Sequence, residues 1–403
     1  FGSRGQVKKH LFSPYRHLSP MKAVIAVTGF AFASAVVPHP DRVAQVRDLQ
    51  DTPGILWKAS VVDRFASKAP GASKSMNGVL SDWRDALSSG VSSGKIVSFT
   101  VNESLSIPTS FDSATNWPQC AKVIGDIRDQ SDCGCCWAFA GAEAASDRMC
   151  ITSNAALLMP LSAQDVCFCA SSDGCNGGQI DTPWDYIQSH GAVTGGQYQG
   201  SGPFGTGFCS DFSLPHCHHH GPQGDDPYPD EGTTGCPSAS SPQCPSSCDS
   251  TASSDHSPFG SDKYTFSGQV ASANGVAGIQ QMIMSGGPVE TAFTVYSDFE
   301  NYDGGIYHHV SGSSVGGHAV KIVGWGEENG VNYWRIANSW NPHWGENGYF
   351  RIRFGEGGVD DSVVASSADA TYSKMSPSPS PSPGPSPSSY YWWSDSETKK
   401  VVV

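Results

Sequence analysis

Positive charge is scarce in this sequence and forms no basic block. The 403 residues include 24 Lys and Arg against 38 Asp and Glu, which gives a formal net charge of −14. Nucleic acids and anionic membranes attract proteins through clustered Lys and Arg side chains. We therefore expect neither of them as a partner.

Long hydrophobic runs are also missing. The run AVIAVTGFAFASAVV, which follows Met21 and Lys22, is shorter than the roughly 20 residues that a membrane-spanning helix needs. A positive residue, a short apolar core and the small residues Ala33-Ser34-Ala35 are typical of a secretory signal peptide. We expect residues 21–35 to be this signal and residues 1–20 to be upstream sequence or a long n-region. A buried helix or a membrane anchor is the alternative.

Cysteine is absent before Cys120, and all 13 cysteines lie between that residue and Cys248. In the oxidising compartment that a signal peptide implies, most should pair, and an odd number leaves at least one thiol free. A disulfide-free segment ahead of a disulfide-rich one suggests a removable pro-segment, residues 36–105, before a folded body, residues 106–371. The Pro/Ser-rich residues 372–403 should be an extended, solvated tail.

Three of the cysteines, Cys133, Cys135 and Cys136, fall within four positions. Their spacing lacks the ligand pattern of a zinc site, and secretion favours disulfides, so we expect no metal and no cofactor. The following stretch, WAFAGAEAASDRM, has strong helix formers and no proline, which predicts a helix that begins near Cys136. A thiol at a helix N-terminus has a lowered pKa and is suited to act as a nucleophile.

Three later stretches predict antiparallel strands. They are HAVKIVGWG (318–326), NYWRIAN (332–338) and YFRIRF (349–354), which alternate and are bounded by Gly and Asn. Helices early and strands late imply an α+β body with two halves and a cleft between them.

Three residues of this later region could complete a site around Cys136. His318 begins a strand and could exchange a proton with the thiol. The Asn338 amide could orient the imidazole, and the Trp340 ring could shield that contact from water.

These motifs together resemble the papain family of cysteine proteases and, within it, the cathepsin B group. Gln130 to Trp137 carry the pattern Gln-x-x-Cys-Gly-x-Cys-Trp, GCNGG occupies 174–178, GGHA 316–319 and NSW 338–340. The resemblance covers the chain from about Ile107 to about Ala365. It implies a papain-like fold with a helical left domain, a β-barrel-like right domain and several disulfides.

The resemblance also implies a role for each matching residue. Cys136 would be the nucleophile, His318 the general acid and base, and Asn338 its orienting residue. Gln130 would donate its side-chain N–H to the oxyanion. The implied substrate-binding residues are Gly177, Gly178, Ala319, Trp340, Ser362, His219 and His220.

An occluding loop, residues 209–248 or thereabouts, is expected where the cathepsin B group has one. There His219 and His220 would bind the C-terminal carboxylate of a peptide, which adds peptidyl-dipeptidase activity to endopeptidase activity. A solvated or adventitious metal-binding loop is the alternative. Asp129 could pair with His219. In the family an arginine of the loop pairs with an aspartate, but this loop has no arginine and His343 stands in place of the aspartate, so one ion pair that would hold the loop is missing.

Ser362 stands where some cathepsins B have a glutamate that binds basic P2 side chains. Because a serine cannot neutralise a buried guanidinium, we expect apolar P2 residues to be preferred over Arg.

Five disulfides follow from the resemblance, and a sixth is our own hypothesis. The implied pairs are Cys120–Cys150, Cys133–Cys175, Cys169–Cys244, Cys209–Cys248 and Cys217–Cys236. Cys135, which replaces a serine of the family, and Cys167 are additional, and we expect them to pair with each other. The alternative is a free Cys135 that can trap Cys136.

The resemblance therefore implies a lysosomal or secreted cysteine peptidase that acts on peptides and proteins. Residues 36–105 would be its own inhibitor, with the maturation cut near NESLSIPTSFD, and cystatin-like proteins are possible inhibitors. The mature form should have no membrane span. The alternative is a catalytically inactive homologue that acts as a binding protein.

Overall fold

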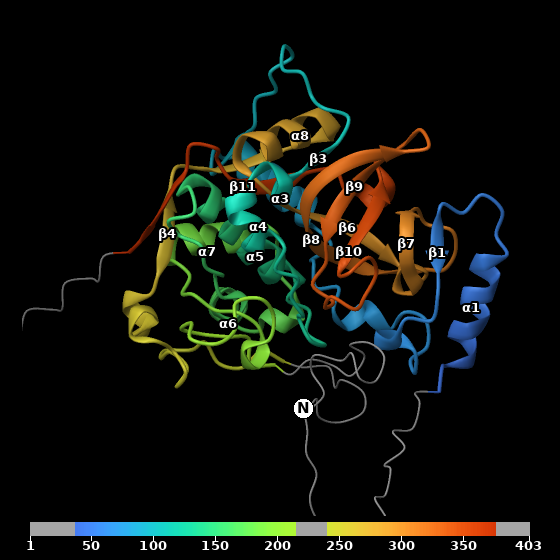
Figure 1. Cartoon of the computed structure of the whole chain (residues 1–403), viewed down its shortest axis with the longest axis horizontal. Helices are drawn as coiled ribbons and strands as arrows, with labels where there is room; N and C mark the ends of the chain where they lie inside the picture. Colours follow the sequence, from blue (N-terminus) through green and yellow to red (C-terminus); the bar gives the residue numbers. More distant parts are fainter. Residues whose placement is uncertain (1–36, 215–239, 376–403) are drawn as a thin grey trace, which may run out of the picture. The chain divides into compact units, whose positions relative to one another are not determined.

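Helices come first along the body of the chain and strands follow, as in the α+β organisation expected from the sequence (Figure 1). The computed structural model describes residues 37–214 and 240–375. The α-helices are α1 Pro40–Gln50, α2 Trp83–Ser92, α3 Ser113–Asn116, α4 Ala121–Ile124, α5 Cys136–Thr152, α6 Ala163–Cys169, α7 Thr182–His190 and α8 Gly275–Gly286. No helix in these two ranges is long and apolar enough to cross a membrane.

Most strands form one ten-stranded sheet in the order β1-β7-β10-β9-β8-β6-β11-β5-β2, with β3 paired to β8, while β4 and β12 form a separate pair. The strands are β1 Trp57–Ala59, β2 Ile96–Ser98, β3 Phe111–Asp112, β4 Tyr264–Ser267, β5 Val270–Ala273, β6 Val289–Tyr296, β7 Tyr302–Tyr307, β8 Ser314–Glu328, β9 Val331–Ala337, β10 Tyr349–Arg353, β11 Val363–Ser366 and β12 Thr371–Lys374. The three strands predicted from alternation are confirmed as β8, β9 and β10.

Helix α5 is the centre of the core. Every residue from Cys136 to Cys150 is buried, and the helix packs against β8 of the sheet as well as against α6 and α7. Small residues permit this close packing: a Cβ at Gly141 would lie 2.3 Å from the Cβ of Pro183 in α7. Helix formers with small side chains therefore place the predicted nucleophile at the start of a rigid, buried element.

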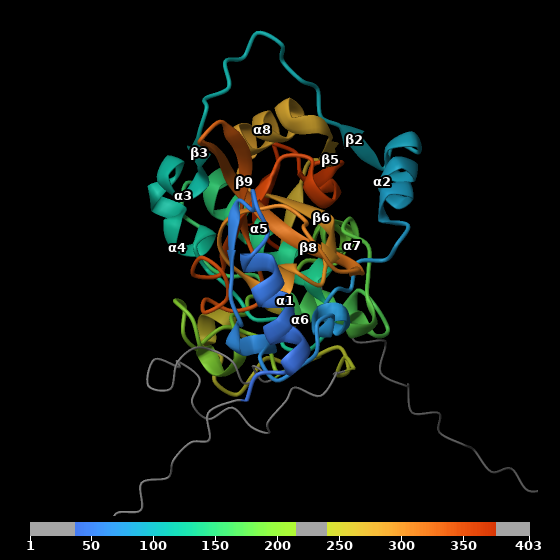
Figure 2. The same cartoon turned by 90° about the vertical axis from the view of Figure 1, so that its right-hand side faces the viewer.

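The N-terminal segment, residues 37–105, is part of the same fold. Its strands β1 and β2 stand at the two ends of the sheet order, where β1 pairs with β7 and β2 with β5. Helix α1 lies beside β1 (Figure 1) and helix α2 beside β2 (Figure 2).

The C-terminal boundary differs from the prediction. Strand β12 continues to Lys374 and pairs with β4, and the side chain of Tyr372 in this strand is buried. The aromatic ring of Tyr372, which packs against Phe266, is why the body extends past residue 371.

Candidate active site

Cys136 begins α5 and is fully buried. Its Sγ accepts a hydrogen bond from the backbone N–H of Gly78, 3.3 Å away, in the N-terminal segment. Burial raises the pKa of the Cys136 thiol from its ordinary 9.0 to about 12, against the opposing effect of the backbone N–H groups of Ala319 and Gly78. The predicted lowering of the thiol pKa is therefore wrong for this form, in which the N-terminal segment covers the thiol. The loss of solvent raises the pKa by more than the helix N-terminus lowers it.

His318 lies in β8, and its Nε2 is 2.8 Å from Oδ1 of Asn338. The Asn338 atom that faces the imidazole also accepts the Ser339 backbone N–H, 2.9 Å away, which identifies it as the amide oxygen. An amide oxygen only accepts hydrogen bonds, so the imidazole must be the donor. Nε2 therefore carries a proton, which leaves Nδ1 as the basic nitrogen. Nδ1 is buried and has no hydrogen-bond partner among the described residues.

The Trp340 ring covers one side of the His318 imidazole. The two ring centroids are 4.9 Å apart, and Trp340 is fully buried. Burial lowers the pKa of His318 from 6.5 to about 4, although the Asn338 bond raises it, and the charge of Arg64 lowers it further. With a raised thiol pKa and a lowered imidazole pKa, both groups are neutral at pH 7 in this form.

Gln130 is held in one orientation by four hydrogen bonds. Its Oε1 accepts from the Ser339 hydroxyl (2.7 Å), and its backbone N–H donates to the Ser339 carbonyl (3.0 Å). Its Nε2 donates to the carbonyls of Cys133 (2.8 Å) and of Met76 in the N-terminal segment (2.9 Å). A main-chain carbonyl of the segment thus occupies the donor expected to bind the oxyanion.

The N-terminal segment also binds both glycine-rich edges of the site. Gly178 donates its N–H to the Gly78 carbonyl (2.9 Å), and Val79 donates its N–H to the Gly317 carbonyl (3.0 Å). A Cβ at Gly178 would lie 2.5 Å from the ring of Trp137, so only glycine fits there. Gly177 has a φ of +108° and is equally intolerant of a side chain.

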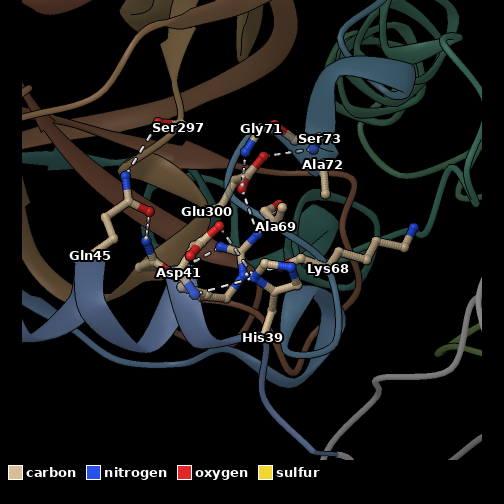
Figure 3. A network of polar contacts seen from close by, with 12 residues as sticks. His39, Asp41, Gln45, Lys68, Ala69, Gly71, Ala72, Ser73, Ser297 and Glu300 are labelled. Atoms are coloured by element: carbon tan, nitrogen blue, oxygen red, sulfur yellow. Dashed lines mark hydrogen bonds and ion pairs between the residues drawn. The ribbon is translucent and has the colours of Figure 1, made fainter.

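Two buried ion pairs fix the segment on the body. Both guanidinium nitrogens of Arg64 donate to the Asp129 carboxylate, at 2.8 and 2.9 Å. Arg42 donates to Glu300 at 2.8 Å, and the same carboxylate accepts the backbone N–H groups of Gly71 (2.9 Å) and Ser73 (2.6 Å) (Figure 3). Asp129, which we expected to pair with His219, is therefore bound to the segment in this form.

The remaining predicted residues divide into two groups. Ala319 is buried, with its N–H toward the Cys136 thiol, and Ser362 is half-buried, with its hydroxyl on the Asp361 carbonyl (2.7 Å). His219, His220 and the central part of the occluding loop lie outside the described residues. Sequence reasoning missed the contacts of Met76 to Leu80, for which the short stretch MNGVL with its small Gly78 was the available signal.

Four disulfides are present among the described residues: Cys120–Cys150, Cys133–Cys175, Cys169–Cys244 and Cys209–Cys248. The pair Cys217–Cys236 lies outside them. The structure contradicts the sixth pair, because Cys135 and Cys167 are free, buried thiols. Burial, followed by a hydrogen bond with Cys167, raises the pKa of Cys135 well above 9.0. The Cys133–Cys175 disulfide already joins the two segments that carry these thiols.

The fold and this arrangement define a class of protein. The model of the papain family of cysteine proteases matches residues 107–368, and the chain belongs to that family.

Within the family the chain is cathepsin B-like. It is 45% identical over 281 residues to cathepsin B-like cysteine proteinase 4 of Caenorhabditis elegans, covering 67% of this chain and 78% of that protein. A cathepsin B-like cysteine proteinase of Schistosoma japonicum is 45% identical over 263 residues, 64% of this chain and 72% of that protein. The solved structure of procathepsin B S9 from Trypanosoma congolense superposes with a TM-score of 0.63 at 27% identity, covering 83% of this chain and 99% of that one. The fold is therefore papain-like, with multiple disulfides.

Proposed function

We propose that the mature protein hydrolyses peptide bonds with Cys136 as nucleophile and His318 as general acid and base. The observation that carries this proposal is the His318–Asn338 contact of 2.8 Å, which leaves Nδ1 as a buried, unpaired base in the described site. Ala319 follows His318 in β8, and its backbone N–H lowers the pKa of the Cys136 thiol, which supports a shared site for the imidazole and the thiol.

The reaction begins when Nδ1 of His318 accepts the thiol proton and Sγ of Cys136 attacks the peptide carbonyl carbon. The oxygen becomes an oxyanion, which Gln130 stabilises with the Nε2 hydrogen bond that Met76 now receives. His318 then donates the proton to the leaving amine and a thioester remains. Water attacks the thioester, gives a proton to His318 and releases the acid, and the proton returns to the thiol.

The N-terminal segment, residues 36–105, acts as an intramolecular inhibitor in this proposal. It covers the thiol with Gly78, occupies the Gln130 donor with Met76 and binds Gly178 and Gly317. Removing it returns solvent to the thiol and the imidazole, which reverses the burial that now keeps both neutral. Four disulfides in the body are consistent with maturation in the secretory pathway.

An epoxysuccinyl thiol reagent tests the proposed function. We expect it to label Cys136 in the mature protein and to leave the full chain unlabelled at pH 7, because the covered thiol has a pKa of about 12 against an ordinary 9.0. Peptide mapping after labelling identifies the modified cysteine. A mature protein that hydrolyses no peptide and takes up no reagent at Cys136 would refute the proposed function and favour the alternative, an inactive homologue.

We further propose peptidyl-dipeptidase activity that depends on His219 and His220. Each imidazolium would attract the C-terminal carboxylate of a substrate, and the activity should rise as the pH falls through their ordinary pKa of about 6.5. His219→Ala with His220→Ala is expected to reduce dipeptide release roughly ten-fold while endopeptidase activity is kept. Comparable dipeptide release from the double variant and the parent enzyme would contradict the assignment of the loop.

A further inference from the structure

Ion pairs between the N-terminal segment and the body all have the same polarity within the described ranges. Each joins a cation of the segment to a carboxylate of the body: Arg42–Glu300, Lys58–Asp303, Arg64–Asp129, Lys68–Asp132, Arg84–Asp361, and Lys95 with both Asp181 and Asp185. The body therefore presents an acidic surface to whatever replaces the segment.

One of these carboxylates, Asp361, lies next to the position proposed to line the P2 pocket, Ser362. The Arg84 guanidinium donates through Nε to Asp361 Oδ2 at 2.7 Å and lies over the ring of Trp83, 4.3 Å from its centroid. The side chain of Asp361 is 50% exposed even with the segment in place, so departure of Arg84 frees an accessible anion.

The site around Asp361 is built to admit a cation closely. A Cβ at Gly358 would lie 2.3 Å from Nη2 of Arg84 and 2.5 Å from Oδ2 of Asp361. Gly358 also has a φ of +75°, which disfavours any other residue. The glycine thus leaves the space in which the guanidinium and the carboxylate meet.

The loop that carries Asp361 is fixed from beneath. The Thr291 hydroxyl in β6 donates to the carbonyl of Val359 (2.7 Å), whose side chain is fully buried. The neighbouring Asp360 carboxylate accepts the indole N–H of Trp334 at 3.2 Å. Because the core holds Val359 and Asp360, the two residues before Asp361, the position of Asp361 does not depend on Arg84.

The segment reaches Asp361 only after it has passed the nucleophile. Gly78 contacts the nucleophile, and Val79, an apolar residue, bonds to Gly317. Leu80 follows and donates its N–H to the carbonyl of Gly178 at 3.2 Å. Arg84, which pairs with Asp361, follows four residues later, so along the segment the contact with the cation comes after the apolar Val79 and Leu80.

We propose that Asp361 binds a Lys or Arg side chain of the substrate at P3 or P4, so that the mature enzyme selects peptides that are apolar at P2 and cationic just before it. The proposal rests on the proposed peptidase function and names its substrate class. A substrate cation takes the place of the Arg84 guanidinium after maturation. Ser362 leaves the P2 pocket without a carboxylate, and Asp361 provides one at its outer side.

The test compares kcat/KM of the mature enzyme for peptides with Val at P2 and either Arg or the neutral Gln at P3 and at P4. We expect Arg to be preferred roughly two- to five-fold at one of these positions at low ionic strength, with the preference reduced by added salt. Asp361→Asn should bring the ratio to about one and leave kcat/KM for the Gln peptides unchanged. That unchanged value also reports correct folding of the variant.

Asp303→Asn is the matched control, since Asp303 pairs with Lys58 rather than with Arg84 and its loss should leave the Arg/Gln ratio intact. Equal rates for Arg and Gln peptides in the parent enzyme, or a ratio that survives in Asp361→Asn, would overturn the proposal while the enzyme still cleaves Gln peptides. Failure to cleave any peptide would instead refute the proposed function itself.

Discussion

Cys136→Ser is expected to reduce peptide hydrolysis by roughly 10⁴- to 10⁶-fold and to leave the full-length chain uncleaved when it is produced alone. A serine hydroxyl ionises far less readily than a thiol, and neutral His318 is a weak base for it. The measurement is kcat/KM on an unblocked peptide, together with the mass of the purified protein.

Cys135→Ser provides the matched control, because it makes the same change one residue earlier. Cys135 is a buried free thiol whose identified partner is Cys167, not His318 or Gln130, and serine is the residue that the family carries there. This control should retain activity and maturation. Parent-like turnover in Cys136→Ser would remove Cys136 from the mechanism, and loss of activity in both variants would point to folding instead.

The sequence predicted the elements that carry the site because their signals are local. Alternation identified β8 and β9, and the helix formers after Cys136 identified α5. The spacing of Cys136, His318 and Asn338 along the chain, however, does not show how far apart their side chains lie. Their assignment to one site came from the family motifs. The structure adds the 2.8 Å contact that fixes the imidazole tautomer.

Burial of charge inside α5 was not predictable from the sequence. Lys321 of β8 is 0% exposed on its side chain and lies 2.8 Å from Asp147 of α5, and Glu143 is one helical turn away at 3.8 Å. Burial raises the pKa of Glu143 to about 7, although Lys321 lowers it. A helix with Glu and Asp on one face is usually read as solvent-facing, and only tertiary packing against a lysine on a central strand reverses that expectation.

The contacts of the N-terminal segment were also beyond sequence reasoning, since they are made largely by the main chain. Met76, Gly78 and Val79 bind through carbonyl and N–H groups that every residue possesses. Side-chain periodicity therefore carries no signal for them. Burial beneath this segment raises the thiol pKa, while the Gly78 N–H lowers it, which is why a local argument from the helix N-terminus gave the opposite direction.

The second large effect is expected from Arg64→Met, which should release the segment from the body. Arg64 and Asp129 are 2% and 0% exposed on their side chains. Removing the cation takes two charge-assisted hydrogen bonds from a buried carboxylate that keeps its contacts with Asn341 and the Ser131 N–H, at a cost of about 3–5 kcal/mol, or roughly 10²- to 10⁴-fold in the docking equilibrium. Detachment of the segment returns Asp129 to solvent, so the cost falls on the latent form alone.

The variant should therefore expose Cys136 to a thiol reagent at a pH where the parent chain stays unlabelled, and it should mature faster. Arg47→Met is the control, because Arg47 is 69% exposed and pairs only weakly with Asp48 of the same helix, at 3.9 Å. The mature enzymes from both variants have identical sequences, so equal specific activity after maturation verifies folding.

Neutralising the carboxylate as well gives the sharper test of the same ion pair. If the loss of the guanidinium charge beside the buried Asp129 carboxylate drives release, Asp129→Asn added to Arg64→Met should restore much of the latency, since a neutral amide is far less costly to bury than a carboxylate. If the guanidinium matters only by filling space, the double variant will mature as fast as Arg64→Met alone. If the Arg64→Met protein is instead labelled at Cys136 and matures at the same rates as the parent, that result would show that the Arg42–Glu300 pair and the main-chain contacts hold the segment without this ion pair.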